Sequence, residues 1–335
     1  MDLIAKAKNR VAPLVSIGPR SVEMLFDTKK FAVEKVEFLK ETIGDEKAFA
    51  AVSGGVDSVV AAMLGHMAVG KNLTVVFLDD GLMREGEPQQ VLARLKSLGL
   101  NARVYKLWDE FFGAMKGLTD PEEKRKAFRD AFYTSLGKIS SELGAKYMIQ
   151  GTIAADVIET KAGVKTQHNV LEQINVHPLE KYGLKILEPL KDIFKPEVRA
   201  VAKSLKMKVE STRRPFPGPG LSIRVIGEVT PERVELVRRA TKVVEEETKK
   251  ITCFQAFAIL LEDKATGVTK DRKRKYGELI VVRAVDSRDA MTAEPVALPW
   301  SVMRKIDKRI RDENPTVTHV LYDLTGKPPA TIEFE

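Results

Sequence analysis

The segment from Ala48 to Leu64 constrains the fold most, because an apolar run, a Ser-Gly-Gly-Val-Asp-Ser turn and a second apolar run follow one another there. The first run, residues 48–52, is short and apolar throughout, which is typical of a strand buried on both faces of a parallel sheet. In the second run the apolar residues recur at helical spacing. The segment therefore predicts a strand, a turn that binds phosphate and a helix, in that order.

The residue types of the turn suit an anionic ligand. Gly54 and Gly55 allow the backbone to take positive φ and to turn its N–H groups toward an anion, while Ser53 and Ser58 add hydroxyl donors at a helix N-terminus. The turn lacks the Gly-Lys-Ser/Thr ending that offers a lysine to a γ-phosphate. Asp57, a carboxylate in this anion site, makes sense if Mg²⁺ lies between it and the phosphates. The alternative is a turn that only begins a helix.

Strands and helices alternate along the first two thirds of the chain, which predicts an α/β fold with a doubly wound, mostly parallel sheet. The β-branched run at residues 73–78 ends in an acidic turn, residues 79–84, and ligands bind at the carboxyl ends of parallel strands. That turn is a candidate wall of a nucleotide site; the alternative is an acidic turn that caps the next helix. The further elements are helices at 28–43, 87–98 and 121–143 and strands at 102–105 and 146–150.

The net charge of +8 would suit either nucleic acid or small anionic substrates. Because the basic residues are spread out and the densest run, Lys270 to Lys275, falls in a predicted connecting loop, we expect no nucleic-acid partner. No apolar run approaches the roughly 20 residues that a membrane span needs, and residues 1–14 lack a signal-peptide core. We therefore expect a cytoplasmic protein without a membrane partner.

The length of 335 residues suits two domains. A Pro-Phe-Pro-Gly-Pro-Gly connector at residues 215–220 is a natural boundary, because prolines fix φ and glycines allow sharp turns. Beyond it the pattern predicts helices at 231–250 and 301–313 and strands at 254–261, 279–285 and 319–324. A single cysteine, Cys253, excludes an internal disulfide, and the four histidines have no metal-ligand spacing.

The Ser-Gly-Gly-Val-Asp-Ser turn resembles the loop of the N-type ATP pyrophosphatases, an adenine nucleotide alpha hydrolase-like fold shared by several families. Four later motifs, in order, resemble the signatures of GMP synthetase, and the match runs from about residue 28 to residue 335. They are Gly-Thr-Ile-Ala-Ala-Asp-Val-Ile-Glu at 151–159, Val-Lys-Thr-Gln-His-Asn-Val at 164–170, Arg-Arg-Pro-Phe-Pro-Gly-Pro-Gly-Leu at 213–221 and Gly-Lys-Pro-Pro-Ala-Thr-Ile-Glu-Phe-Glu at 326–335.

The resemblance implies an ATP pyrophosphatase domain at 28–212 and a smaller α+β domain at 213–335 that dimerises and completes the site for xanthosine 5′-monophosphate (XMP), after an extension at 1–27 of unknown role. ATP would adenylate XMP, and ammonia would then displace AMP to give GMP. Because the match begins near residue 28 and Cys253 has no glycine elbow around it, the resemblance is to the stand-alone ATP pyrophosphatase chain of the two-subunit, archaeal-like form. A separate glutamine amidotransferase subunit would supply the ammonia.

The resemblance also implies roles for individual residues. The ATP-binding set is Ser53, Gly54, Gly55, Val56, Asp57, Ser58, Val59, Asp79, Gly81 and Gly151. The catalytic residues are Asp156, Glu159 and Lys165; Asp57 and Asp156 would hold Mg²⁺; Arg125, Arg213, Lys327 and Glu333 would bind XMP. Asp156 and Glu159 also have the alternative of being only helix-start acids, and Lys165 that of a surface lysine.

Two other functions share some of these features. Another adenylating amidase, such as NAD synthetase, would have the same loop but no reason to end in Lys-Pro-Pro-Ala-Thr-Ile-Glu. A nucleotide- or RNA-binding module without catalysis would have no reason to keep Asp57, Asp156, Glu159 and Lys165. The lid segment departs from the family pattern, because Gln167, Leu171 and Glu172 replace a histidine and two glycines.

Overall fold

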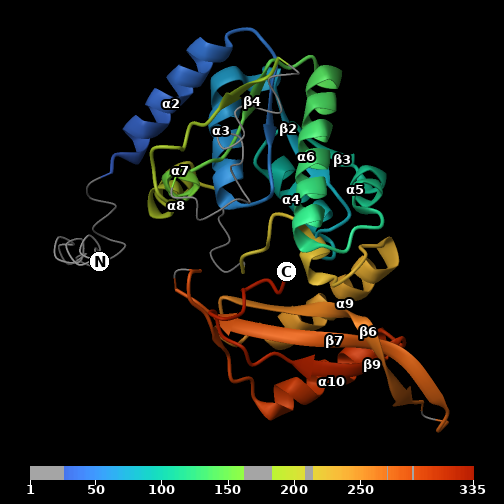
Figure 1. Ribbon diagram of the computed structural model, residues 1–335. Coiled ribbons are helices and arrows are strands. Elements are labelled where there is room, and N and C mark those ends of the chain that lie inside the picture. The colour runs from blue at the N-terminus through green and yellow to red at the C-terminus, as the bar shows by residue number, and fades with distance from the viewer. Residues whose placement is uncertain (1–25, 162–182, 208–213, 270, 289) are drawn as a thin grey trace, which may run out of the picture.

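The computed structural model describes residues 26–161, 183–207, 214–269, 271–288 and 290–335. Two sheets, each with its own helices, lie one above the other in Figure 1, and the chain passes from the upper to the lower sheet. Both sheets were expected, and the fold class predicted from the sequence is confirmed. The predicted lid, residues 164–170, and the predicted boundary at residue 212 lie outside the described residues.

The first sheet is entirely parallel. Its order is β3-β2-β1-β4-β5. The strands are β1 (Ala48–Ala51), β2 (Leu73–Asp79), β3 (Ala102–Lys106), β4 (Tyr147–Ile149) and β5 (Lys185–Leu187). Because the chain runs outward from β1 to β3 and then returns to the other side of β1 for β4 and β5, the topological switch point lies between β1 and β4. Ligands of such sheets bind there.

Helices cover both faces of this sheet, which explains the uninterrupted apolar run of β1. Ala48 and Ala50 join one buried cluster with α2, α3, α4 and α8, whereas Phe49 between them joins a cluster with α6 on the opposite face. Successive strand residues point to opposite faces, so both faces of β1 need apolar side chains. The helices are α2 (Thr28–Ile43), α3 (Val56–Val69), α4 (Glu87–Ser97), α5 (Trp108–Met115), α6 (Pro121–Leu143), α7 (Ala154–Lys161) and α8 (Lys195–Ser204), with a 3₁₀ turn η1 (Gly70–Asn72).

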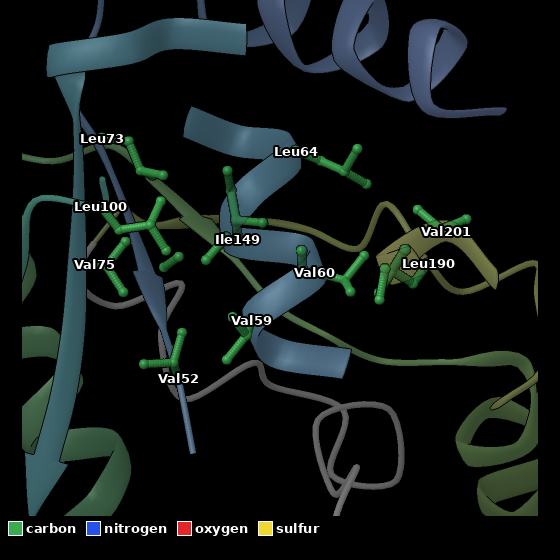
Figure 2. Close-up of a cluster of buried hydrophobic side chains, with 14 of the residues drawn as sticks. Val52, Val59, Val60, Leu64, Leu73, Val75, Leu100, Ile149, Leu190 and Val201 are labelled. Atoms are coloured by element: carbon green, nitrogen blue, oxygen red, sulfur yellow. The ribbon is translucent and has the colours of Figure 1, made fainter. Parts of the chain in front are cut away.

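Helix α3 is held rigidly behind the Ser-Gly-Gly turn. In Figure 2 its residue Val60 lies toward Val201 of α8, while Val59 lies on the other side, toward Val52 at the end of β1. Val59 and Val60 are fully buried. Burying such side chains stabilises the fold by about 1.5–3 kcal/mol each. The N-terminus of α3 is therefore fixed against the sheet edge.

The second sheet is built from β6 (Gln255–Val268), β7 (Arg274–Asp286), β8 (Glu294–Pro295) and β9 (Val317–Tyr322). β7 pairs antiparallel with β6 and β8 and parallel with β9. Helices α9 (Pro231–Glu247) and α10 (Trp300–Glu313) and the 3₁₀ turn η3 (Gly220–Arg224) contribute to one cluster with Ile280, Val282 and Ala284 of β7.

Several elements differ from the sequence expectation. The β6–β7 hairpin is longer than predicted, so Arg274 and Lys275 belong to β7, and the connecting loop is restricted to residues 269–273. Its outer half carries polar side chains on both faces and therefore lacks the apolar signal of a buried strand. The short elements α5, β5 and α8 were not expected. Helix α9 ends at Glu247, earlier than the predicted residue 250.

The two units share one apolar cluster. Leu82 and Phe111 from the first unit pack in the same buried cluster as Leu221, Val225 and Val237 from the second. The rim of this contact is polar: Arg84 Nε donates to Glu245 Oε1 at 2.7 Å and Lys242 Nζ to Glu85 Oε1 at 2.9 Å. The interface is therefore part of the folded core. Within the described ranges, no helix is both long and apolar enough to span a bilayer.

Candidate active site

The Ser-Gly-Gly turn lies at the switch point of the first sheet and touches the segment after β4. A Cβ on Gly151 would lie 2.6 Å from the backbone nitrogen of Ser58 and 2.7 Å from the carbonyl carbon of Asp57. Backbone atoms of both segments are thus in direct contact, and only glycine fits at position 151. The structure brings Gly151 to the predicted phosphate loop, although the two are far apart in the sequence.

Within the loop only one of the two glycines uses its conformational freedom. Gly54 has φ +80°, whereas Gly55 is extended, with φ −68°, and precedes α3. The expectation of positive φ at both glycines is therefore wrong for Gly55. Ser58 Oγ accepts from Ser53 N at 3.2 Å and donates to Gly55 O at 3.1 Å, which ties the loop together. The first backbone N–H groups of α3, which have no helical acceptor, point out of its N-terminus and suit an anion.

Asp57 makes a contact that the sequence did not reveal. Its Oδ2 pairs with Lys195 Nζ, at the first residue of α8. Its other oxygen, Oδ1, is buried and accepts no hydrogen bond from the residues that the structure describes. A buried carboxylate oxygen without a donor fits a Mg²⁺ ion, which binds one or two carboxylates together with phosphate oxygens. The donor set at this position therefore fits the predicted metal.

Lys195 is the functional candidate that sequence reasoning missed. Lys-Pro-Glu is a helix-start signal, and Glu197 Oε2 accepts from Phe194 N at 2.7 Å as the start of α8 requires. The segment before it is held beside α7 by Ala154 N, which donates to Ile193 O at 2.9 Å. The sequence could reveal the helix start but not its approach to Asp57. The loop thus lacks a lysine of its own and obtains an ammonium from α8.

The predicted catalytic acids lie on α7, which directly follows Gly151. Asp156 Oδ2 accepts from Ile153 N at 3.0 Å, the contact of a helix-start acid. Glu159 lies one turn further in the same helix, and residues three apart share a helix face. The alternative of a capping role for Asp156 is therefore realised in this structure, and its catalytic role stays a prediction. Lys165 lies outside the described residues.

The acidic turn after β2 uses its own carboxylates for local structure. Asp79 Oδ1 accepts from Gly81 N at 3.2 Å and from Trp108 Nε1 at 2.9 Å. Gly81 has φ +77°, and a Cβ there would lie 2.8 Å from the Phe112 ring. Asp80 is buried, accepts from the backbone of the turn and has its pKa raised to about 7, mainly by burial. Nucleotide contacts of Asp79 and Gly81 stay predictions.

The predicted XMP residues are found at the junction of the two units, where Figure 1 places the C-terminal end. Arg125 is a half-buried residue of α6, and its Nη1 pairs with Glu122. Glu333 accepts from Arg224 Nε at 3.0 Å and from Gln255 Nε2 at 2.7 Å. These contacts keep the Glu333 carboxylate in one place.

The other two predicted XMP residues are described less fully. Lys327 Nζ donates to Ala290 O at 2.9 Å, and its backbone pairs with Ala293. This contact fixes the lysine beside β8 but occupies only one of its three ammonium protons. Arg213 lies outside the described residues. The structure therefore brings the C-terminal segment near Arg125, and it does not describe the second predicted arginine.

A serine- and glycine-rich loop at the switch point of a doubly wound sheet, with an aspartate in the loop and its lysine supplied by another helix, defines a nucleotide-binding α/β protein of the N-type ATP pyrophosphatase class. A family model described as GMP synthase C terminal domain matches residues 241–334.

The similar curated proteins include chains from three archaea, each named as one of the subunits of glutamine-hydrolyzing GMP synthase. The protein from Methanopyrus kandleri is 51% identical over 320 residues, which cover 93% of this chain and all of the relative. That from Pyrococcus furiosus is 49% identical over 311 residues, covering 92% of this chain and 97% of the relative. That from Archaeoglobus fulgidus is 47% identical over 310 residues, covering 92% of this chain and all of the relative. The chain belongs to this family of GMP synthase subunits.

Proposed function

We propose that this chain is a ligase that converts XMP to GMP with ATP and ammonia through an adenylyl-XMP intermediate, releasing AMP and pyrophosphate. The observation that carries the proposal is the near full-length identity to the archaeal GMP synthase subunits. The phosphate loop with its buried, unpaired Asp57 oxygen supports it independently. In the first step the C2 oxygen of XMP forms a bond to the α-phosphorus of ATP, and the electron pair of the broken α–β bond leaves on pyrophosphate.

The loop residues stabilise the charge that develops in this step. Ser53, Ser58 and the first N–H groups of α3 are donors for the departing pyrophosphate, and the Lys195 ammonium adds a positive charge. Asp57 and Asp156 would hold Mg²⁺, which would neutralise phosphate charge when bound. Glu159 and Lys165 complete the proposed catalytic set. In the second step ammonia bonds to C2, the C2–O bond breaks, and AMP leaves with that oxygen.

The substrate nucleotide is proposed to lie between the units. Arg125 and Arg213 suit its phosphate because guanidinium groups donate two parallel hydrogen bonds to such oxygens. The Lys327 ammonium has protons to donate beyond its contact with Ala290, and Glu333 is held in place by Arg224 and Gln255. These contacts support a site that binds XMP at the junction of the two units.

We further propose that ammonia comes from a separate glutamine amidotransferase subunit. The relatives are named as one of several subunits of a glutamine-hydrolyzing enzyme, which supports a second chain. Cys253 is a poor candidate for a glutaminase nucleophile, because it packs against the C-terminal core and burial raises the pKa of its thiol. A thiol with a raised pKa forms little of the reactive thiolate at neutral pH.

The first experiment measures pyrophosphate release from ATP by the purified chain with Mg²⁺ and ammonium, with and without XMP. We expect release that depends on XMP and is accompanied by GMP. Release that instead depends on nicotinic acid adenine dinucleotide, with none on XMP, would favour the NAD synthetase alternative and contradict the proposal.

The second experiment compares nitrogen donors. The purified chain is given ATP, Mg²⁺ and XMP with either ammonium or glutamine. We expect GMP from ammonium alone. GMP formed from glutamine without any added protein would overturn the two-subunit proposal.

We also propose that the chain forms a homodimer through residues 213–335 and works in the cytoplasm without nucleic acid. Support for the dimer comes from β9, an edge strand with exposed Leu321 and, just beyond it, exposed Leu324. Exposed apolar residues at a sheet edge are a common interaction surface. The absence of a membrane-spanning helix within the described ranges is compatible with the proposed location.

A further inference from the structure

The last three residues of the sequence form a strained turn. Phe334 has φ +77°, and Glu335 N donates to Glu333 O at 2.9 Å, which closes a three-residue turn. A positive φ is rare for a bulky side chain, and such γ-turns are strained. Strained backbone persists only where the surroundings hold it, and it concentrates at functional sites. The contacts that hold this turn are therefore informative.

The first anchor of the turn lies within the C-terminal unit. Glu333 pairs with Arg224, which is 1% exposed and lies over the Phe257 ring at 3.9 Å. Gln255 Nε2 donates both to Glu333 and to Pro215 O. A guanidinium packed on an aromatic ring and bonded to a carboxylate has little freedom to move. This anchor fixes Glu333 relative to the second sheet.

The second anchor crosses to the first unit. Lys124 of α6 has a fully buried side chain, and its ammonium donates to Val225 O at 2.9 Å, to Gly227 O at 3.2 Å and to the Glu335 side chain. All three ammonium protons are thus used. The Glu335 side chain is itself almost completely buried. The two carboxylates of the turn, Glu333 and Glu335, are therefore held from opposite units.

A buried ion pair is weak evidence for a purely stabilising role. Desolvating Lys124 and Glu335 costs free energy, and well-packed apolar residues often replace such pairs without loss of stability. What the pair provides here is a defined geometry between two segments. Lys124 immediately precedes Arg125 near the start of α6, and this start is itself fixed because the Asp120 side chain accepts from Glu122 N and Glu123 N at 2.9 Å.

We propose that Lys124 is a positioning residue for the nucleotide monophosphate substrate: by holding Glu335 it fixes the strained Glu333–Glu335 turn against α6, so that Arg125 and Glu333 meet the same XMP molecule from the two units. This inference rests on the proposed function. Lys124 and Glu335 make no contact with substrate in this scheme. Their effect is exerted through the position of their neighbours, so XMP binding should depend on them and ATP binding should not.

The test compares Lys124→Met, Glu335→Ala and the double variant with Lys126→Met, a matched control because Lys126 is an exposed lysine of the same helix. GMP formation from ammonium gives KM for XMP and for ATP. We expect KM for XMP to rise about tenfold or more in each single variant, with KM for ATP within about twofold of the wild type. We expect the double variant to be no worse than the weaker single variant, because both changes break one contact. The control should match the wild type.

Glu335→Ala keeps the test decisive if Lys124→Met does not fold, because it removes only the side chain of residue 335. A folded Glu335→Ala variant with the wild-type KM for XMP would overturn the inference. Equal rises in both KM values would also overturn it, since they would indicate general loosening. A wild-type chain that forms no GMP would overturn the proposed function, and this inference with it. GMP formation by the wild type beside an unaffected variant overturns this inference alone.

Discussion

The two oxygens of Asp57 are in unlike surroundings. One pairs with Lys195, and the other is buried without a donor among the residues that the structure describes. Leaving a buried acceptor unpaired costs about 1–3 kcal/mol. Folded proteins tolerate such a cost where a ligand supplies the missing partner. At the scale of one residue, this oxygen is the clearest physical sign of the proposed Mg²⁺ and phosphate site.

We predict that Asp57→Ala abolishes Mg²⁺-dependent pyrophosphate release, with a loss on the order of 100-fold or more, because it removes a group that organises charge in the transition state. The fold should survive, since the side chain lies beside the loop and not among the apolar residues. Asp45→Ala, at an exposed aspartate, is the matched control. Normal turnover by a soluble Asp57→Ala protein would contradict the role of Asp57.

Asp80 predicts a pH dependence of stability. Its pKa is raised from 3.8 to about 7, mainly by burial. Between these values the folded chain keeps a proton that the unfolded chain releases, so the free energy of unfolding contributed by Asp80 falls as pH rises from about 4 to about 7. Each pKa unit corresponds to about 1.4 kcal/mol.

Asp80→Asn removes this titration while keeping an oxygen that can accept from Leu82 N. We therefore expect the melting temperature of Asp80→Asn, relative to the wild type, to increase between pH 4 and pH 7 and to level off above it. Thermal melts of both proteins across this range test the expectation. A difference that does not change with pH would mean that Asp80 is ionised in the fold throughout.

At the scale of elements, the close approach of the segment after β4 to α3 makes Gly151 critical. We predict that Gly151→Ala destabilises the fold by about 1–3 kcal/mol and raises KM for ATP, because its Cβ would overlap backbone atoms of Ser58 that cannot swing aside. Gly113→Ala is the control: Gly113 lies in α5 with open space around it, and alanine there should stabilise by about 0.5–1 kcal/mol. Denaturant unfolding and ATP kinetics measure both. Equal behaviour of the two variants would contradict this packing.

The elements that the sequence predicted are those with strong local signals. The β1 strand, the turn and α3 follow from an apolar run, two glycines and helical spacing, and the two long helices α6 and α9 follow from Pro at their starts and regular spacing. β5 is only three residues long, too short for a pattern to show. The outer part of the β6–β7 hairpin was missed because its strands carry polar side chains on both faces.

The site was predicted less completely than the fold, for a physical reason. Lys124 stands in Glu-Glu-Lys-Arg-Lys, which looks like an exposed helix face, yet its side chain is buried. Burial of Lys124 depends on Val225 and Gly227, and the role of Lys195 depends on Asp57. Contacts between residues so far apart in the chain leave no periodic trace in one sequence.

At the scale of the whole molecule, the packing between the units favours a preformed substrate junction. The apolar cluster that joins Leu82 and Phe111 to Leu221 and Val237 is continuous across it. Large relative movements of the units would expose this surface to water, at about 25 cal/mol per Å². We therefore expect adjustments on substrate binding to be confined to loops and side chains.

We predict a homodimer at micromolar concentration, since closed two-fold dimers are the commonest oligomers. Sedimentation equilibrium should give twice the mass of one chain. Leu324→Glu, at a residue that is 74% exposed in the single chain, should shift the equilibrium toward monomer. Val33→Glu, on the exposed side of α2, is the control. A fully active wild-type monomer would remove the claim.

The central claim is that ATP is attacked at its α-phosphorus by the C2 oxygen of XMP. It is tested most directly with XMP carrying ¹⁸O at C2, unlabelled ATP, Mg²⁺ and ammonium, followed by mass spectrometry of the AMP. Because the C2–O bond breaks only after that oxygen is bonded to phosphorus, the account predicts one ¹⁸O atom in the AMP phosphate for each GMP formed. Unlabelled AMP, or ADP as the product, would contradict it.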